Sequence, residues 1–299
     1  MMKHIYNKLA TVAIALMALL TACNNEEQLY NGPSYVMFAD TLNVCPVYQE
    51  GEAYQVAVSA TRTASYDRNF GVEVLHAKSN AIEGVHYTLN TNTVTIPAGE
   101  LATSIEVAGI YENIEESDSL NLRLRLVSLD EEMEWDYYGM EANVSFRKVC
   151  PYDINNFTRY AVVQSSFLNE FKPYGDKARL IMTERVEGKE NSVILHDLFT
   201  DGYDVELTLD NKDPLNPVAS VREGDIIGTA QEFLMGTYGD NMLRIADYTS
   251  VISTFNTCQN RAVLYSLVYV NKVGYVGAYV TVVRWISDAE AEDILQNGF

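Results

Sequence analysis

Residue types that commonly perform catalysis are sparse and widely separated in this sequence. The four histidines are His4, His76, His86 and His196, and the last three fall in different predicted strands or corners. No GxSxG, HExxH, P-loop or GxGxxG motif occurs, and the 41 acidic residues offer no distinguishable pair for glycoside hydrolysis. Catalysis needs converging groups with defined roles, so the sequence predicts a protein that is not an enzyme and uses no cofactor.

The densest group of aromatic residues lies in MEWDYYG, residues 133–139, which we expect to link the last two strands of the first domain. Trp135, Tyr137 and Tyr138 stand there beside two acidic residues, so their rings could stack on a sugar while the carboxylates bind its hydroxyls. These three are the candidate ligand-binding residues. The same pattern also fits a hairpin whose alternate aromatic side chains pack on the sheet or on the second domain.

The first 22 residues have the pattern of a secretory signal peptide. Lys3 and Lys8 make the start cationic, and an apolar run of 12 residues, LATVAIALMALL, follows at 9–20. A membrane-spanning helix needs about 20 apolar residues, whereas a shorter run behind a cationic start is typical of a signal peptide. We therefore expect residues 1–22 to be removed from the mature protein.

The end of this segment, Leu20-Thr21-Ala22-Cys23, resembles the bacterial lipobox. The resemblance implies cleavage before Cys23 and acylation of that cysteine. Each buried CH₂ adds about 0.8 kcal/mol, so two or more acyl chains would hold the protein stably at a membrane. Residues 23–34 are then an acylated tether, and its acidic start, NNEE, resembles the signal that sends some Gram-negative lipoproteins to the cell surface. The implied location is the cell surface, where the lipid anchor would hold the protein at the outer face of the outer membrane.

Three further cysteines, Cys45, Cys150 and Cys258, are far apart in the chain. An exported protein permits disulfides, but an odd number leaves at least one thiol unpaired, and the spacing does not choose among the three pairings. Buried free thiols are an equal alternative. No CxxC or mixed histidine–cysteine cluster indicates a zinc site.

The charge of the chain excludes one class of partner. The formal net charge of the 299 residues is −20, and binding to nucleic acid normally needs clustered lysine and arginine, of which the sequence has no patch. A hydrophobic content of 47% is sufficient for packed cores. The length fits two domains of ordinary size.

Residues 35–148 alternate between apolar and polar side chains, as half-buried antiparallel strands do. Val56 and Val58 alternate with polar or small neighbours in YQVAVSATR, and four leucines alternate with polar residues in LNLRLRL. Turn residues separate these runs at spacings of about 8–15 residues, which favours a β-sandwich of about seven strands.

Four segments of this half resemble, in order, the Calx-beta module. They match its E-G pair, its G-x-D-Y corner, its T-φ-x-φ-P-x-G turn and its acidic bend: residues 50–51, 84–87, 93–99 and 115–120. The resemblance covers about 115 residues and implies an immunoglobulin-like sandwich.

Some Calx-beta modules bind Ca²⁺ through acidic residues at one end of the sandwich, where several oxygens must converge at about 2.3–2.6 Å. The weak candidates here are Glu50, Glu112, Glu115, Glu116 and Asp118. His86 replaces the aspartate of the family's corner, and Arg147 and Lys148 replace the acids that end its last strand. The sequence therefore predicts no metal site.

Residues 149–299 contain at least eight short strand-like runs separated by turn residues. This pattern favours an antiparallel meander closed into a lipocalin-like barrel, whose interior is either filled by side chains or hollow enough for a ligand. Ser287 and Glu290 form a predicted capping box at the start of a short C-terminal helix that covers a barrel end. The pairing of the two domains resembles Gram-negative surface lipoproteins of families of unknown function.

Two functional hypotheses follow from these observations. The first is a cell-surface binding module for a glycan or small ligand, motivated by the tyrosine-rich segments and the anchored, acidic two-domain build. The second is a structural or assembly protein that positions partner proteins at the outer membrane.

Overall fold

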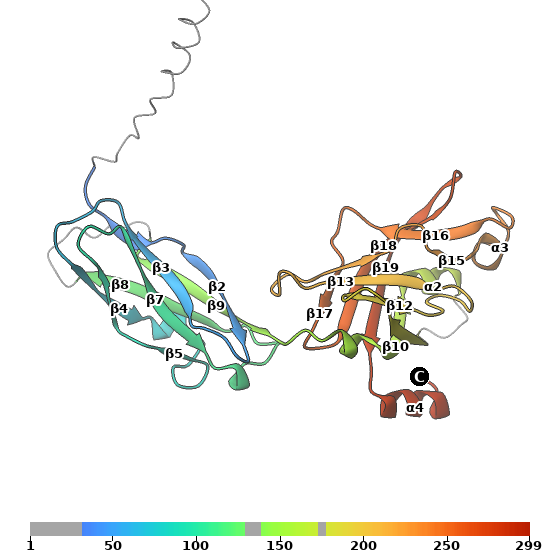
Figure 1. Cartoon of the computed structure of the whole chain (residues 1–299), viewed down its shortest axis with the longest axis horizontal. Helices are drawn as coiled ribbons and strands as arrows, with labels where there is room; N and C mark the ends of the chain where they lie inside the picture. The colour runs from blue at the N-terminus through green and yellow to red at the C-terminus, as the bar shows by residue number, and fades with distance from the viewer. Residues whose placement is uncertain (1–31, 129–138, 173–177) are drawn as a thin grey trace, which may run out of the picture.

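The computed structural model describes residues 32–128, 139–172 and 178–299. They form two β domains, and the chain passes from the first domain to the second once, after strand β9 (Figure 1). The predicted signal peptide at 1–22, Cys23 and most of the tether at 23–34 lie outside the described residues. Within the described part of the chain, no helix is long and apolar enough to cross a membrane.

The first domain is a sandwich of two sheets. One sheet has the order β1-β3-β7-β5, with bounds Val36–Phe38, Tyr54–Ala60, Ala102–Gly109 and Tyr87–Leu89. The other has the order β2-β9-β8-β4-β6, with bounds Leu42–Tyr48, Glu141–Val149, Asn121–Ser128, Arg68–Val74 and Thr93–Ile96. Two 3-10 turns, η1 (His76–Lys78) and η2 (Tyr111–Asn113), connect strands. The predicted immunoglobulin-like sandwich is confirmed.

The core of the sandwich follows the alternation in the sequence. Val56 and Val58 are fully buried on β3, and the alternating leucines Leu122, Leu124 and Leu126 of β8 are buried against them in the same cluster. One expectation was wrong: β2 pairs with β9 in parallel, in register from Leu42↔Asn143 to Tyr48↔Val149. Period-two alternation sets which face is buried and carries no information about strand direction, and the long connection between the two strands permits either.

The second domain is a closed antiparallel barrel. Its strands run in the order β18-β17-β14-β13-β12-β11-β10-β19, and β19 pairs back onto β18. Their bounds are Arg261–Val270, Thr254–Asn256, Val218–Val221, Val205–Asp210, Ser192–Leu195, Arg179–Arg185, Arg159–Ser165 and Gly274–Trp285. The C-terminal half of β18 also pairs with β16 (Met242–Asp247). The other edge of β16 pairs with β15 (Ile226–Thr229).

Aromatic side chains fill the barrel. Around Phe157, which lies in η3 (Ile154–Phe157), the rings of Trp285 and Phe255 have centroids 5.0 and 5.5 Å away. A second cluster surrounds Phe167 of α2 (Ser166–Phe171), and buried leucines and valines occupy the space between. The question that the sequence left open is answered in favour of a filled interior.

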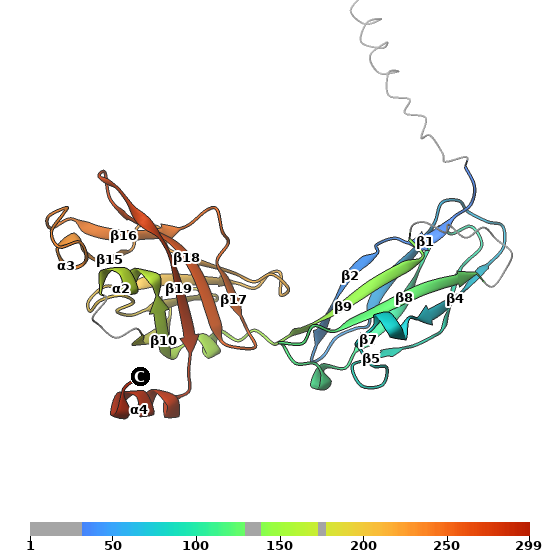
Figure 2. The ribbon, with the colours of Figure 1, turned by 180° about the vertical axis from the view of Figure 1, so that it is seen from behind.

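The C-terminal helix α4 (Asp288–Asn297) follows β19 and lies beyond that end of the barrel (Figure 2). Ser287 caps it as predicted, because its hydroxyl accepts a hydrogen bond from the Glu290 N–H at 3.2 Å. The reciprocal half of the capping box is replaced: the Glu290 carboxylate binds the Arg284 guanidinium at 2.7 and 3.2 Å. A charge-assisted pair with two N–H donors is the stronger partner for that carboxylate.

A disulfide joins Cys150, at the domain boundary, to Cys258, in the turn between β17 and β18. This settles one of the three pairings that the sequence allowed, and Cys45 is the remaining buried free thiol. Burial raises the pKa of the Cys45 thiol to about 12, so this side chain stays protonated and inert at neutral pH.

The disulfide closes a loop with a sequence separation of 108 residues. Cross-linking a loop of roughly 100 residues removes unfolded-state entropy worth up to about 5 kcal/mol. We therefore expect the Cys150→Ser/Cys258→Ser double variant to lose about 3–5 kcal/mol in the free energy of unfolding of the barrel. Urea denaturation followed by Trp285 fluorescence in a Trp135→Phe background would measure this, and an unchanged barrel transition would contradict it.

Candidate functional site

The structure does not test the aromatic residues predicted to bind ligand, because Trp135, Tyr137 and Tyr138 lie outside the described residues. They stay a prediction. A binding site must therefore be sought among the cavities and side-chain clusters of the described residues.

The acidic residues considered for Ca²⁺ lie on loops at the end of the sandwich where β2 and β9 finish. Glu50 follows β2, Glu112 is in η2, and Glu115 and Asp118 lie in the turn before β8. The Asp118 carboxylate accepts the Glu115 N–H at 2.8 Å and so holds the turn itself. No group of three or more histidine, cysteine, aspartate or glutamate side chains among the described residues could hold a metal ion.

The histidines have separate structural surroundings. His86 stands where the Calx-beta corner has aspartate, and its Nδ1 accepts the Ile82 N–H at 3.0 Å. His196 lies between two carboxylates, with Nε2 at 3.2 Å from Glu184 Oε1 and Nδ1 at 3.0 Å from Asp204 Oδ2. Among the described residues, no hydroxyl or thiol is bonded to either ring nitrogen of His196, so this cluster has the acids but not the nucleophile of a catalytic triad.

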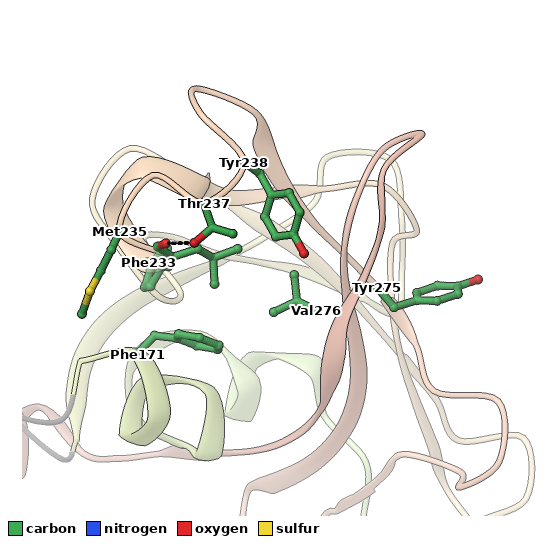
Figure 3. Close-up of a pocket in the computed structure, with 8 residues that line it drawn as sticks. Phe171, Phe233, Met235, Thr237, Tyr238, Tyr275 and Val276 are labelled. Carbon is green, nitrogen blue, oxygen red and sulfur yellow. Dashed lines mark hydrogen bonds between the residues drawn. The ribbon is translucent and has the colours of Figure 1, made fainter.

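A cavity of about 320 Å³ opens at one mouth of the barrel. Helix α2, the loop after helix α3 (Ala230–Phe233) and the start of β19 surround it (Figure 3). We call it the mouth pocket, and its lining is Phe171, Phe233, Leu234, Met235, Thr237, Tyr238, Tyr275 and Val276. None of these side chains is charged, and its volume is near the lower end of the range of about 300–1,000 Å³ that small-molecule sites occupy.

The floor of the mouth pocket is fixed by the aromatic core beneath it. The Phe167 ring lies 5.0 Å from Phe171 and 4.8 Å from Phe233, measured between centroids. Phe233 is held close by Gly228 on β15, where a Cβ atom would stand 2.5 Å from the ring and the backbone φ is +144°. Only glycine combines that conformation with that approach, so these rings are positioned before any ligand arrives.

Beside the mouth pocket, Gly277 of β19 leaves room for the side chain of Tyr279. A Cβ atom at Gly277 would stand 2.6 Å from the hydroxyl of Tyr279, whose side chain folds back over the glycine. Tyr279 thereby reaches the rings of Phe167 and Phe171 at centroid distances of 5.2 and 6.0 Å. Burial, together with the charge and hydrogen bonding of Glu170, raises the pKa of Tyr279 to about 12.

The rim of the mouth pocket is exposed and combines apolar surface with phenolic hydroxyls. Met235 is 95% exposed and Tyr275 is 75% exposed. In Figure 3, Tyr238 lies over the opening opposite Phe171, whereas Tyr275 projects away from it. The Thr237 hydroxyl donates to the Leu234 carbonyl at 2.8 Å and keeps its acceptor capacity. Such a surface can bind the apolar face of a small molecule and exchange a few hydrogen bonds at its edge.

Sequence reasoning found only part of this site. It predicted a barrel whose interior could be filled or could hold a ligand, and it missed the segment FLMGTYGDN, residues 233–241. The signal that could have been used is the combination of large apolar residues with two glycines, which is unusual for a solvent-exposed turn.

Comparisons with known proteins place the barrel half of the chain in a family. Residues 137–297 match the model described as a domain of unknown function, DUF4984. No curated protein matches the sequence.

Among solved structures, a protein of unknown function from Bacteroides ovatus is similar, with 10% identity, a TM-score of 0.35 and coverage of 83% of this chain and 89% of its own. An auxiliary nutrient binding protein from Bacteroides thetaiotaomicron has 12% identity, a TM-score of 0.30 and coverage of 81% and 89%. The apo-form Calx CBD1 domain has 14% identity, a TM-score of 0.32 and coverage of 39% and 98%. Likenesses this distant carry no inference about what the present chain binds.

The raised pKa of Tyr279 gives a pH dependence. A free tyrosine has a pKa of about 10, so between pH 10 and about 12 the unfolded chain loses a proton that the folded chain keeps. The stability that the buried neutral phenol contributes is present below pH 10 and is lost as the pH rises toward 12. We expect the free energy of unfolding to fall less steeply over this range in Tyr279→Phe than in the unmodified protein. Denaturant titrations at pH 9 and pH 11.5 would measure the difference, and parallel losses would contradict it.

Proposed function

We propose that this chain, which belongs to the DUF4984 family of domains of unknown function, is a non-enzymatic binding protein. It binds a sugar unit, or a small ligand of similar shape, in the mouth pocket. The observation that carries the proposal is the pocket itself, with its preformed aromatic floor and uncharged, hydroxyl-bearing rim. Its lining offers contact surface and orientation, and it contains no carboxylate, histidine, cysteine, lysine or arginine side chain.

The lining suits a sugar ring for a physical reason. The C–H faces of a pyranose are apolar and can pack flat against an aromatic ring, while its hydroxyls project sideways toward the rim. Phe171 and Tyr238 face each other across the opening in Figure 3. Among the described residues, the hydroxyls of Tyr238 and Tyr275 make no hydrogen bond and are available to a ligand.

Replacing Tyr238 tests this site. Aromatic side chains are enriched among the contact residues whose truncation costs more than about 1 kcal/mol, so we expect Tyr238→Ala to weaken binding by about tenfold. A panel of neutral oligosaccharides, screened by thermal shift and then titrated by calorimetry, would supply the ligand. Tyr66→Ala, which removes an exposed ring from the sandwich, is the matched control and should bind normally. Absence of any ligand from such a panel would count against the proposal.

The proposed location rests on the sequence at Cys23. We propose that residues 1–22 are cleaved, that Cys23 is acylated, and that the two domains are held at the outer face of the outer membrane. The formal charge of −20 disfavours adhesion to an anionic surface without such an anchor.

The anchor has a direct test. In a Gram-negative host, Cys23→Ser should abolish incorporation of labelled fatty acid and move the protein from the membrane fraction to the soluble fraction. Cys45→Ser, which alters a buried thiol in the sandwich, should leave the protein in the membrane fraction. Membrane retention of Cys23→Ser would show that the protein is not held by lipid at this residue.

The alternative function, positioning of partner proteins, is favoured by one surface. Strand β2 lies at the edge of its sheet, and Leu42, Val44 and Tyr48 expose apolar side chains along it. An unpaired edge with apolar side chains is a place where another chain can add a strand. Recovery of a stoichiometric partner from detergent-solubilised membranes would support this role, and isolation of the protein as a free monomer would weaken it.

A further inference from the structure

A second cavity lies between the two domains. It has a volume of about 450 Å³. We call it the interdomain groove. Its sandwich wall is the end of β9 with Glu116, and its barrel wall consists of residues 214–218, Ile252 and residues 254–258. It shares no lining residue with the mouth pocket.

Two adjacent cations stand in this groove, Arg147 and Lys148. Nη1 of the Arg147 guanidinium donates a hydrogen bond to the Leu215 carbonyl at 3.0 Å. The Lys148 ammonium stands 4.3 Å from the centroid of the Tyr111 ring. Neither side chain forms a salt bridge with a carboxylate among the described residues, although acidic residues outnumber basic ones 41 to 21 in the chain.

Two carboxylates in or beside the groove accept hydrogen bonds from other donors. Glu116 accepts the side-chain amide of Asn256 across the groove. Asp213 accepts the Asn216 side chain at 2.9 Å and the Leu215 N–H at 3.0 Å. These hydrogen bonds, and to a lesser extent the charge of Arg147, lower the pKa of Asp213. The free donors of Arg147 and Lys148 therefore remain open toward the groove.

Apolar surface lies next to the two cations. Ile252 is 68% exposed and Val218 is partly exposed, and both line the groove with the buried ring of Phe255. A fitting ligand carries an anionic group on one side and an apolar face on the other. A planar carboxylate suits a guanidinium because two parallel hydrogen bonds can form.

The groove is held open by covalent and hydrogen bonds. The Cys150–Cys258 disulfide joins the domain boundary to the barrel wall, and the Thr257 hydroxyl donates to the Cys150 carbonyl at 2.9 Å. With the Arg147–Leu215 and Asn256–Glu116 contacts, these bonds fix both walls before a ligand binds. Preorganisation of this kind lowers the entropic cost of binding.

We propose that the interdomain groove is a second binding site, specific for a saccharide that carries a carboxylate, such as a hexuronate unit. Arg147 and Lys148 bind the carboxylate, and Ile252 and Val218 contact the ring. That the ligand is a saccharide rests on the proposed function; the preference for a carboxylate rests on the groove alone.

Calorimetric titration of the full chain with trigalacturonate tests the proposal, with neutral and sulfated trisaccharides as comparison ligands. We expect trigalacturonate to bind and the neutral sugar not to bind in the groove. Arg147→Gln/Lys148→Gln should weaken trigalacturonate binding at least tenfold, and raising the salt concentration should weaken it further. Lys148→Gln alone keeps the Arg147–Leu215 hydrogen bond and should weaken trigalacturonate binding by a smaller factor.

Two control variants distinguish binding in the groove from a general effect of charge and from binding in the mouth pocket. Arg62→Gln/Lys78→Gln removes the same charge from exposed positions elsewhere on the sandwich and should bind normally. Tyr238→Ala alters only the mouth pocket and should also bind trigalacturonate normally. The proposal is overturned if trigalacturonate does not bind, if the sulfated sugar binds equally well, or if the two control variants lose binding as much as the groove variants do. A failure of neutral sugars to bind would instead count against the mouth pocket.

Discussion

Strand β19 is hydrogen-bonded along both of its edges, and the second domain depends on this. It pairs with β10 from Ala161↔Trp285 to Ser165↔Thr281 and with β18 from Arg261↔Arg284 to Val270↔Gly274. Because the first and last strands of the domain are thus joined, the main ring of strands has no open edge. Alternate side chains of the strands face the inside of this closed ring. The aromatic rings around Phe157 and Phe167 fill the space that they leave.

The filled interior determines where a ligand can bind. A lipocalin-like barrel with a hollow core would bind inside, but here buried aromatic, leucine and valine side chains fill the interior. What remains is a shallow pocket where α2, α3 and the first residues of β19 meet. The same rings that stabilise the fold form the floor of that pocket, so a substitution at Phe233 would change both the stability of the barrel and the shape of the pocket.

The sequence predicted those features that depend on local pattern. The alternating leucines of β8 and the valines of β3 indicated the buried face correctly, as did Ser287 for the start of α4. It did not predict the features that depend on direction or distance. Alternation cannot distinguish parallel from antiparallel pairing of β2 with β9, and Cys150 and Cys258 are brought together only by the path of eight intervening strands. The mouth pocket has the same origin, since Phe171, Tyr238 and Val276 come from three separate elements.

The parallel pairing of β2 with β9 makes the sandwich a spacer. Since both strands run the same way, the chain leaves the sandwich at the end opposite to the one where β2 begins (Figure 1). Antiparallel pairing would return the chain to its starting end. The nine residues of β9 span about 30 Å at roughly 3.3 Å per residue. The barrel is therefore carried that far beyond the start of the sandwich, and the disulfide at Cys150 limits its rotation about the connection. If the preceding residues are fixed to a membrane, the mouth pocket and the interdomain groove stand clear of the lipid headgroups, within reach of large polymers.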